Sequence, residues 1–395
     1  MPQGTAVVIG AGVGGLTTAV ALHRRGWRVK VLERSRRRTR VGAGIGLAPN
    51  AVKALEGLGL ADWLGRAGVP QGSAGVRRPD GSWLVRTDLG RLEARFGRPL
   101  VVVPRSELVA VLVDMLPEQA LSLDAPVTQV EPGDRGSLAV VRTARTEHAA
   151  RVVVAADGIN SAVRAALFPG HPGPAYAGFT AWRMIASAPT GMAVGASVSW
   201  GRGAIFGIVP MAGGRLYCYA TANLPRGTRY PDEKAALSGR FADWHDPIPE
   251  LIRTTAPQDV MRHDVCSLNR PLLAYHQGRV ALLGDAAHAM TPNLGQGGCQ
   301  AIEDAVVLAH RLGAGGADLD VEAALAAYTA DRLARTTRIV RQSARLGRLQ
   351  QLDSRLRISA RDTVIRLAGK LGPSLMMRHM DPVAGWVPPP DAPVK

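Results

Sequence analysis

The stretch AVVIGAGVGG, residues 6–15, decides the fold. It begins with an apolar run typical of a buried β-strand and continues into the pattern G-x-G-x-x-G, formed by Gly10, Gly12 and Gly15. In this pattern the first glycine permits a tight turn, the second lets the backbone approach a pyrophosphate, and the third lets the next helix pack close to the strand. The N–H groups at the start of that helix can bind phosphates. These residues predict a Rossmann-like α/β domain that binds a dinucleotide.

An acidic residue stands where the second strand of such a unit ends. The apolar run at residues 29–32 leads into Glu33, 18 residues after Gly15. A carboxylate at this spacing accepts a hydrogen bond from a ribose 2′-hydroxyl and repels a 2′-phosphate. A glycine-rich turn at a chance spacing is the alternative, but strand, helix and acid together favour an adenine dinucleotide.

A second motif, far downstream, indicates which dinucleotide. Asp285 follows a short apolar strand, and the glycine-rich loop at residues 291–299 opens a further helix. An acid can accept hydrogen bonds from the ribityl hydroxyls of a flavin, and a helix N-terminus beside it can stabilise the negative charge of the reduced ring. NAD(H) needs no such second site, so the motif favours FAD. The alternative is that Asp285 caps a helix and the glycines only turn the chain.

The order of these motifs predicts an interleaved architecture of the α/β class. A Rossmann-like FAD-binding domain is expected to comprise residues 1–70, 98–174 and 266–340. Short alternating runs predict a mostly antiparallel β-sheet domain for the substrate at residues 71–97 and 175–265. Residues 341–395 are expected to form C-terminal helices and a Pro-rich tail.

Composition narrows the class of protein. The 395 residues are 46% hydrophobic and 20% charged, which is typical of a globular protein with two or three folding units. The net charge is +16, but only 5% of residues are aromatic, so platforms for stacking bases are scarce and we expect no nucleic-acid partner. The three cysteines stand far apart, and no apolar stretch is long enough for a membrane span. We therefore expect a cytoplasmic enzyme, either a monomer or a homodimer.

Six arginines recur at helical spacing near the C-terminus. Such spacing among Ala, Leu and Ile predicts a solvated helix face rather than a nucleic-acid or membrane surface. These residues are Arg332, Arg335, Arg338, Arg341, Arg345 and Arg348.

The chain resembles the single-component class A flavoprotein monooxygenases, the family of p-hydroxybenzoate hydroxylase, and most of all the group of salicylate hydroxylase, urate hydroxylase and zeaxanthin epoxidase. Three family signatures occur in order: the fingerprint that ends at Glu33-Arg34, the segment ADGINSAVR at 156–164, and Gly284-Asp285 with residues 292–304. The segments GAGIGLAPN at 42–50 and PRSEL at 104–108 also match the family. Together these segments span about three quarters of the chain.

The resemblance implies a set of cofactor-binding residues beyond the glycine fingerprint. Asp157 is typically tied to FAD and to productive use of NAD(P)H. The other residues implied to line the FAD site are Gly14, Glu33, Arg34, Gly46, Arg105, Val127, Asp285, Gly295, Gln296, Gly297, Gly298 and Cys299. The residues expected in the substrate pocket are Ile205, Tyr217, Pro292 and Asn293.

The resemblance also implies the reaction. Transient NADH or NADPH reduces the bound FAD, O2 adds at C4a of the flavin to give a hydroperoxide, and its distal oxygen is transferred to an aromatic or olefinic small molecule. Because the cofactor supplies this chemistry, we assign no catalytic residue and no metal. An FAD-dependent oxidoreductase without oxygen insertion and a non-catalytic binding protein on the same fold are the alternatives.

The sheet domain bears on the substrate. Urate-hydroxylating relatives are similar in this region but carry an arginine where Ile205 aligns. An aliphatic side chain cannot pair with a urate or carboxylate anion, so we expect a largely apolar or neutral substrate with Tyr217 as its polar contact. Arg183 could bind an acid if it turned inward, but we expect an outward-pointing or structural arginine.

Overall fold

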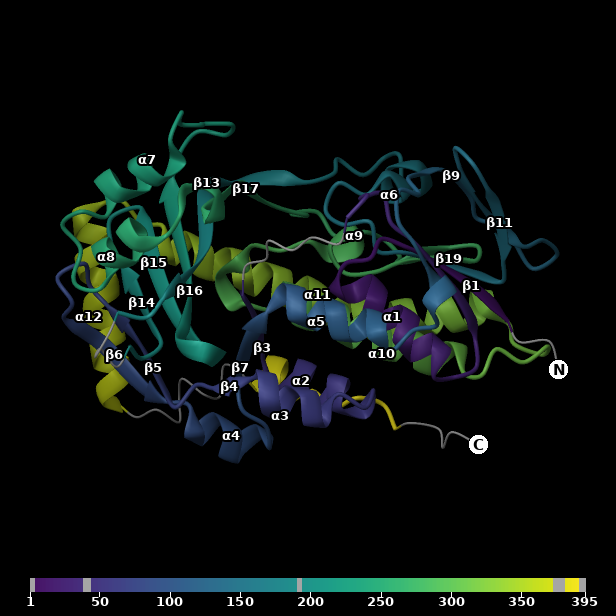
Figure 1. Ribbon diagram of the computed structural model, residues 1–395, viewed down its shortest axis with the longest axis horizontal. Coiled ribbons are helices and arrows are strands. Elements are labelled where there is room, and N and C mark those ends of the chain that lie inside the picture. The colour runs from purple at the N-terminus through teal and green to yellow at the C-terminus, as the bar shows by residue number, and fades with distance from the viewer. Residues whose placement is uncertain (1–3, 38–43, 190–193, 372–380, 391–395) are drawn as a thin grey trace.

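The computed structural model describes residues 4–37, 44–189, 194–371 and 381–390, and Figure 1 shows two sheet regions side by side along the long axis of the molecule. Gly42 and Ala43, at the start of the 42–50 segment, and the end of the tail at 391–395 lie outside the described residues. The mixed α/β class expected from the sequence is confirmed.

The first region is built on a six-stranded sheet in the order β18-β19-β12-β1-β2-β8. Strand β1 pairs in parallel with β12 and β2, so that Ala6 lies opposite both Val152 and Val29. Helices α1, α5 and α10 lie below this sheet in Figure 1 and the small sheet of β9, β10 and β11 lies above it, which explains the apolar character of the central strands. The strands are β1 (Thr5–Ile9), β2 (Arg28–Leu32), β8 (Leu121–Ser122), β9 (Val127–Glu131), β10 (Ala139–Thr143), β11 (Glu147–Ala150), β12 (Val152–Ala155), β18 (His276–Gln277) and β19 (Val280–Leu282).

The second region is a seven-stranded sheet in the order β17-β13-β16-β15-β14-β5-β6. Its described neighbours pair antiparallel except β14 and β5. Trp182, Phe206 and Cys218 point from one face into a core that also contains Phe241. The strands are β5 (Ser73–Arg77), β6 (Trp83–Asp88), β13 (Ala175–Ser187), β14 (Ser197–Trp200), β15 (Ala204–Met211), β16 (Arg215–Asn223) and β17 (Met261–Ser267).

A third, three-stranded sheet lies between the two regions, with β7 in its centre. It consists of β3 (Gly44–Leu47), β4 (Val69–Pro70) and β7 (Val101–Pro104). The helices of the described chain are α1 (Val13–His23), α2 (Pro49–Gly57), α3 (Ala61–Ala67), α4 (Gly90–Phe96), α5 (Arg105–Asp114), α6 (Ala162–Leu167), α7 (Glu233–Arg240), α8 (Ile248–Thr254), α9 (Asp285–His288), α10 (Gly297–Leu312), α11 (Val321–Gln350), α12 (Arg355–Leu371) and α14 (Asp381–Ala384), with short 3-10 turns η1 (Glu118–Ala120), η2 (Ala212–Gly214), η3 (Pro257–Asp259) and η4 (Pro292–Leu294).

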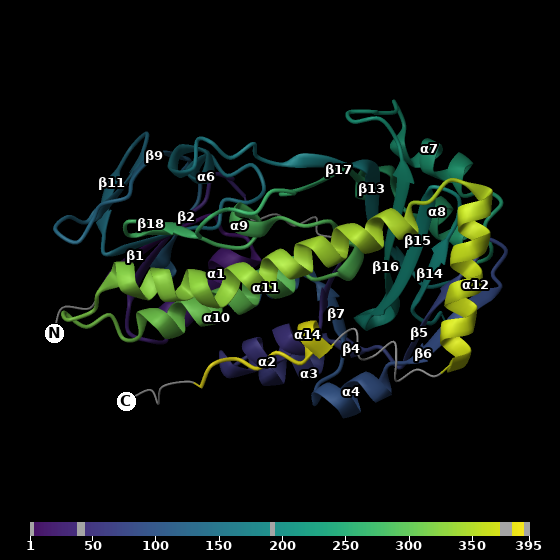
Figure 2. The same ribbon diagram turned by 180° about the vertical axis from the view of Figure 1, so that it is seen from behind.

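Helix α11 joins the two regions. Figure 2 shows it running without interruption from the parallel sheet to the second sheet, where α12 follows. The domain boundary predicted between residues 340 and 341 falls inside this helix, and the division into domains stays a prediction. Asp320 caps the helix through the N–H of Ala323, and the chain leaves the helix only at Gln351.

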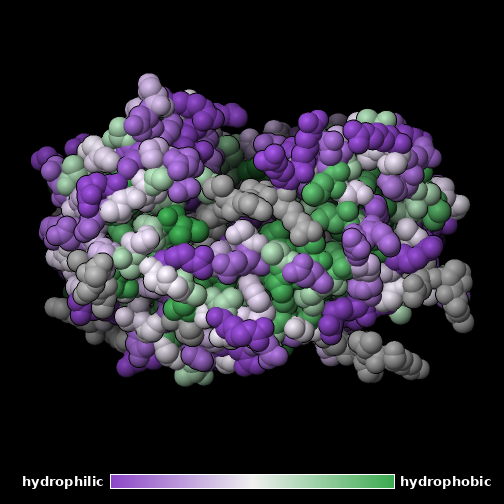
Figure 3. Space-filling view, in the orientation of Figure 1, coloured by the Kyte–Doolittle hydropathy of each residue, from purple (hydrophilic) through white to green (hydrophobic). Residues whose placement is uncertain are grey.

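Polar residues cover much of the face of the molecule seen in Figure 1. Figure 3 shows hydrophilic side chains spread over this face, and a hollow at its upper edge between the two regions. None of the described helices combines the length and the apolar character that a membrane span requires.

Candidate functional site

The glycine turn after β1 lets neighbouring backbone segments pack closely together. Gly10 has a φ of +101°, and a Cβ there would lie 2.5 Å from the carbonyl oxygen of Ala156. A Cβ on Gly15 would overlap the carbonyl oxygen of Gly10, so only glycine lets α1 start this close to the strand. Gly12 caps α1 without a side-chain hydrogen bond, which leaves the first N–H groups of the helix available to an anion.

Glu33 ties the end of β2 to this turn. One oxygen of its carboxylate accepts a hydrogen bond from the N–H of Ala11 at 2.8 Å, and the other accepts one from the N–H of Ser35 at 2.9 Å. Each oxygen keeps a second lone pair that can accept from a ribose hydroxyl. Arg34 beside it is exposed.

A cavity of about 880 Å³ starts at this turn and reaches the second sheet. Its size lies within the roughly 300–1,000 Å³ of small-molecule sites. Seven of the residues predicted to bind the cofactor line it: Gly10, Gly12, Glu33, Arg34, Arg105, Val127 and Asp157. Gly14 does not, because it lies where α1 packs on Leu283 and Ala301, and a Cβ would come within 2.8 Å of the first.

Asp157 stands in the cavity wall with an unsatisfied atom. Its Oδ2 accepts a long hydrogen bond from the N–H of Val163 at 3.4 Å, whereas the buried Oδ1 has no partner among the described residues. Nearby, Arg164 donates to the carbonyl oxygens of Ile159 at 2.7 Å and Ala286 at 3.0 Å. Burial lowers the pKa of Arg164 and the charge of Asp157 raises it. Arg164 thus connects the Asp157 loop to the turn that carries Asp285, a role that we did not predict from the sequence.

The second predicted motif forms the turn and helix start expected of it. Gly284 has a φ of +61°, and the exposed Asp285 begins α9 with no hydrogen bond from that helix to its carboxylate in the described structure. Burial lowers the pKa of the Arg105 guanidinium, the charge of Asp285 raises it, and the charge of Arg183 lowers it. The helix-cap alternative therefore lacks its hydrogen bond.

The loop before α10 faces the β3 segment. Gln296 caps α10 without a side-chain hydrogen bond, and nothing lies within 4 Å of a Cβ placed on Gly295 or Gly46. The thiol of Cys299 donates to the carbonyl oxygen of Gly46 at 3.4 Å. Burial raises the pKa of Cys299 to about 12, so this thiol is no nucleophile at neutral pH.

The comparisons with known proteins agree with this geometry. A family model for an FAD binding domain matches residues 4–343. An aurachin C monooxygenase/isomerase of Stigmatella aurantiaca is 38% identical over 365 residues, which cover 92% of this chain and 94% of the relative. An FAD-dependent urate hydroxylase of Klebsiella pneumoniae is 34% identical over 340 residues, or 85% and 87% of the two chains. The crystal structure of Klebsiella pneumoniae HpxO complexed with FAD and uric acid is 29% identical, has a TM-score of 0.87, and matches over 95% of each chain.

The chain belongs to the class A flavoprotein monooxygenases. Its residues fit FAD on observations of its own structure. The uncapped N-terminus of α1 faces the cavity, the buried Oδ1 of Asp157 has no partner among the described residues, and Gly46 and Gly295 border open space. A phosphate-bearing ligand with polar groups along its length would satisfy these features.

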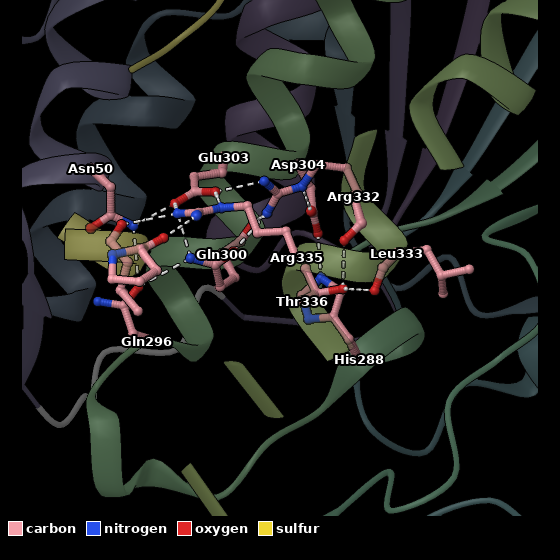
Figure 4. A network of polar contacts seen from close by, with 12 residues as sticks. Asn50, His288, Gln296, Gln300, Glu303, Asp304, Arg332, Leu333, Arg335 and Thr336 are labelled. Carbon is pink, nitrogen blue, oxygen red and sulfur yellow. Dashed lines mark hydrogen bonds and ion pairs between the residues drawn. The ribbon is translucent and has the colours of Figure 1, made fainter. Parts of the chain in front are cut away.

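Under the flavin motif of this monooxygenase lies a buried charged network that sequence reasoning missed (Figure 4). Arg332, only 1% exposed, donates from Nε to Asp304 and from Nη1 to Glu303, both at 2.6 Å. Asp304 also accepts from the N–H of Gly284 at 3.0 Å and pairs with His288 at 2.6 Å. Burial alone would raise the pKa of Asp304, but the charges of His288 and Arg332 lower it to about 2.

The other half of the network binds two more segments. Glu303 accepts from Asn50 at 2.6 Å and from Arg335 at 2.7 Å, and Asn50 also donates to Gln296 at 3.1 Å. Arg335 reaches the carbonyl oxygens of Pro382 and Val383 in α14. The solvated helix face predicted for the arginines is therefore wrong for Arg332 and for the half-buried Arg335. Arg338, Arg341, Arg345 and Arg348 are exposed as expected. The sequence does contain a sign of this buried network, because Glu303 and Asp304 are adjacent acids in a largely apolar stretch of helix.

The predicted substrate residues lie apart from the cavity. Ile205 is 2% exposed beside Trp200, its cross-strand neighbour, and the ring of Trp200 lies 5.2 Å from the Arg361 guanidinium of α12. The ring of Tyr217 packs against Gly44 of β3. Asn293 follows Pro292 in η4 and donates to Gln350 at 2.6 Å. None of these four lines the cavity, and their roles toward a substrate stay predictions.

Arg183 of β13 lines the cavity together with Met261 and His263 of β17. Of the two alternatives expected for this arginine, the outward orientation is therefore wrong, and a structural role stays a prediction. Its chain neighbours Trp182 and Met184 point into the core of the second sheet, which leaves Arg183 to the opposite face.

Proposed function

We propose that the protein is an NAD(P)H-dependent FAD monooxygenase that hydroxylates or epoxidises a largely apolar aromatic or olefinic small molecule. One observation supports this above the others. A single cavity runs from the phosphate-binding turn at Gly12 to the face of the second sheet at Arg183, so a dinucleotide and a small molecule can meet inside it. The activity named for the two curated relatives, monooxygenase and hydroxylase, supports the same class of reaction.

When bound, FAD supplies the redox and oxygen-activating chemistry. The protein has to bind and orient both molecules and exclude water. We propose that the α1 N-terminus holds the pyrophosphate and Glu33 the adenosine ribose. Asp285 would accept from the ribityl hydroxyls, and the uncapped start of α10 would stabilise negative charge on the reduced ring.

No residue is assigned as acid or base. His288, the histidine nearest the flavin motif, is 3% exposed and uses Nε2 to pair with Asp304 at 2.6 Å. That bond gives it a structural function in the network. NAD(P)H is proposed to dock transiently, since the described fold contains one glycine fingerprint of the dinucleotide type.

The experiment is a substrate screen on the yellow, FAD-loaded protein. We expect an aromatic or olefinic compound to accelerate NADH or NADPH oxidation and to gain one oxygen atom, detected by mass spectrometry. If every compound gave as much hydrogen peroxide as NAD(P)H oxidised, the protein would be an oxidoreductase without oxygen insertion. Protein that binds FAD but oxidises neither nucleotide would support a binding protein on this fold.

A further inference from the structure

Helix α12 packs one of its sides on the second sheet. Arg361 and Asp362 are buried on this side, and Asp362 accepts a hydrogen bond from Nε of Arg78 at 2.8 Å. Further along the helix, a Cβ placed on Gly369 would come within 3.0 Å of Val85 in β6. Figure 2 shows α12 in front of the second sheet at the end of the molecule, with no other described element drawn over it. The contacts with the sheet therefore determine which side of the helix faces away from the protein.

The outer side of α12 exposes a row of apolar side chains. Leu356 is 85% exposed, Val364 63% and Leu367 55%. With the exposed Ala360 they follow one another at intervals of four, four and three residues, which places them on one face of the helix. Three of the seven large apolar residues that are exposed in the described part of the chain lie on this helix, and the other four lie in separate segments. The row is thus a concentrated apolar patch, unlike the scattered exposure that is usual on protein surfaces.

Arginines border this apolar row on both of its sides. At 3.6 residues per turn, Arg357 lies on one flank of the row, and Arg355 and Arg366 lie on the other. All three are exposed, and their guanidinium groups make no hydrogen bond or ion pair with a described residue. The one acid of the helix, Asp362, is buried on the inner side. The outer side of α12 therefore combines apolar surface with free positive charge.

The acids near this face do not cancel its charge. Asp353 is exposed just before the helix, but Arg202, also exposed, donates to its carbonyl oxygen at 2.7 Å and adds a further positive charge. Asp80 belongs to the turn between β5 and β6: hydrogen bonds from Ser82 lower the pKa of its carboxyl most, and the charge of Arg366 lowers it further. The net charge of +16 on the whole chain favours the same sign of partner.

The combination of leucines and arginines decides which class of partner fits. A nucleic acid would pair with the arginines but leave the leucines exposed, and α12 has no aromatic side chain on which a base could stack. A second copy in a twofold dimer would bury the leucines but bring the arginines of both copies together. The surface of an anionic bilayer offers acyl chains to the leucines and negative headgroups to the arginines.

We propose that α12 binds the surface of a membrane that contains anionic lipid. The apolar row enters the boundary between headgroups and acyl chains, roughly 5–10 Å deep, and the flanking arginines pair with the lipid headgroups. The helix lies in the plane of the membrane and does not cross it. This inference goes beyond the proposed function and does not depend on it, because no residue of α12 lines the cavity.

The test is flotation of the FAD-loaded protein with two kinds of vesicle. One kind is phosphatidylcholine alone, and in the other about a third of the lipid is phosphatidylserine. We expect binding to the serine vesicles to be about a hundredfold tighter, because each of three arginines near an anionic surface contributes roughly fivefold. Added salt should weaken this binding, since it screens the charges. The readout needs no turnover, so the result is independent of the substrate screen.

Two variants separate the parts of the face. Arg355→Gln/Arg357→Gln/Arg366→Gln should remove most of the preference for serine vesicles. Leu356→Gln/Leu367→Gln keeps the charges but should weaken binding to serine vesicles about tenfold or more, because it removes apolar surface that enters the bilayer. All of these side chains are exposed, so the flavin spectrum and the melting temperature should match those of the wild type.

Matched controls change the same residue types elsewhere. Leu273→Gln replaces a leucine that is 93% exposed outside α12, and it should bind as the wild type does. The arginine control removes the same charge by replacing three exposed arginines outside α12 with glutamine: Arg24, Arg28 and Arg66. An equal loss in this control would overturn the inference and assign the binding to the net charge of the chain. Failure to bind serine vesicles would also overturn it, and a dimer that Leu356→Gln/Leu367→Gln dissociates would then assign the face to a second copy.

Discussion

The glycine turn and the cavity face of the second sheet are two walls of one cavity, but the chain specifies them differently. At the turn, the requirement is set by backbone atoms a few residues apart: a side chain on Gly15 would overlap the carbonyl of Gly10. At the second sheet, Arg183 sits between Trp182 and Met184, and the strand pattern alone does not say which face is covered. Here the helices packed on one face decide, and they come from distant sequence. A site made by backbone is therefore readable from a motif, whereas a site made by side chains is not.

The largest expected effect comes from breaking the buried charged network under the second flavin motif. Arg332→Ala leaves Glu303 and Asp304 fully buried without their main cation. Removing one partner of a buried ion pair costs about 3–5 kcal/mol of unfolding free energy, measured by urea denaturation. Arg338→Ala, on the exposed side of the same helix, is the matched control and should change stability by less than about 0.5 kcal/mol. Equal losses in both variants would mean that the network does not stabilise the fold.

A substitution at Gly12 separates binding from folding at the turn. A Cβ there meets only Arg105, at 3.8 Å, so Gly12→Val should fold while its side chain fills the space of the pyrophosphate. We expect FAD affinity to fall more than about a hundredfold, with colourless protein after purification and an apoprotein melting temperature near that of the wild type. Gly15→Val, in contrast, should destabilise the apoprotein itself. Stoichiometric FAD in Gly12→Val would refute the interpretation of the turn.

Asp285→Ala tests the second flavin motif with a smaller effect. Its exposed carboxylate makes no hydrogen bond to α9 in the described structure, so apoprotein stability should hardly change. If it accepts from the ribityl chain, its loss costs about 1.5–3 kcal/mol, or roughly tenfold to a hundredfold in the FAD dissociation constant. FAD titration of the apoprotein measures this, with Asp285→Asn as the conservative partner. An unchanged titration would leave Asp285 without a role toward FAD.

The same contrast explains how far the sequence could be interpreted. The α/β class, the fingerprint from Gly10 to Glu33 and the FAD-binding family follow from local patterns, because spacing and glycine geometry act within a few residues. Arg332 was misread because its helical spacing matches that of Arg338, and only the packing of α11 on α10 separates the buried arginine from the exposed one. That error comes from long-range packing that no single stretch encodes. Ile205 was placed by resemblance and does not line the cavity, and its role toward a substrate stays a prediction.

The smallest expected effect tests the electrostatics at the cavity face of the second sheet. Burial and the positive charges of Arg183 and Arg262 lower the pKa of His263 to about 4, against the ordinary value of 6.5. Below pH 6.5 the unfolded chain binds a proton at this histidine that the folded protein does not, so stability falls as the pH drops from 6.5 toward 4 and is unaffected above 6.5. Between pH 7.5 and 5.5 the wild type should lose about 1 kcal/mol more unfolding free energy than His263→Gln, which cannot titrate. Urea denaturation of the FAD-loaded protein at the two values measures the difference. Parallel losses in the two proteins would show that burial and these charges do not hold His263 neutral.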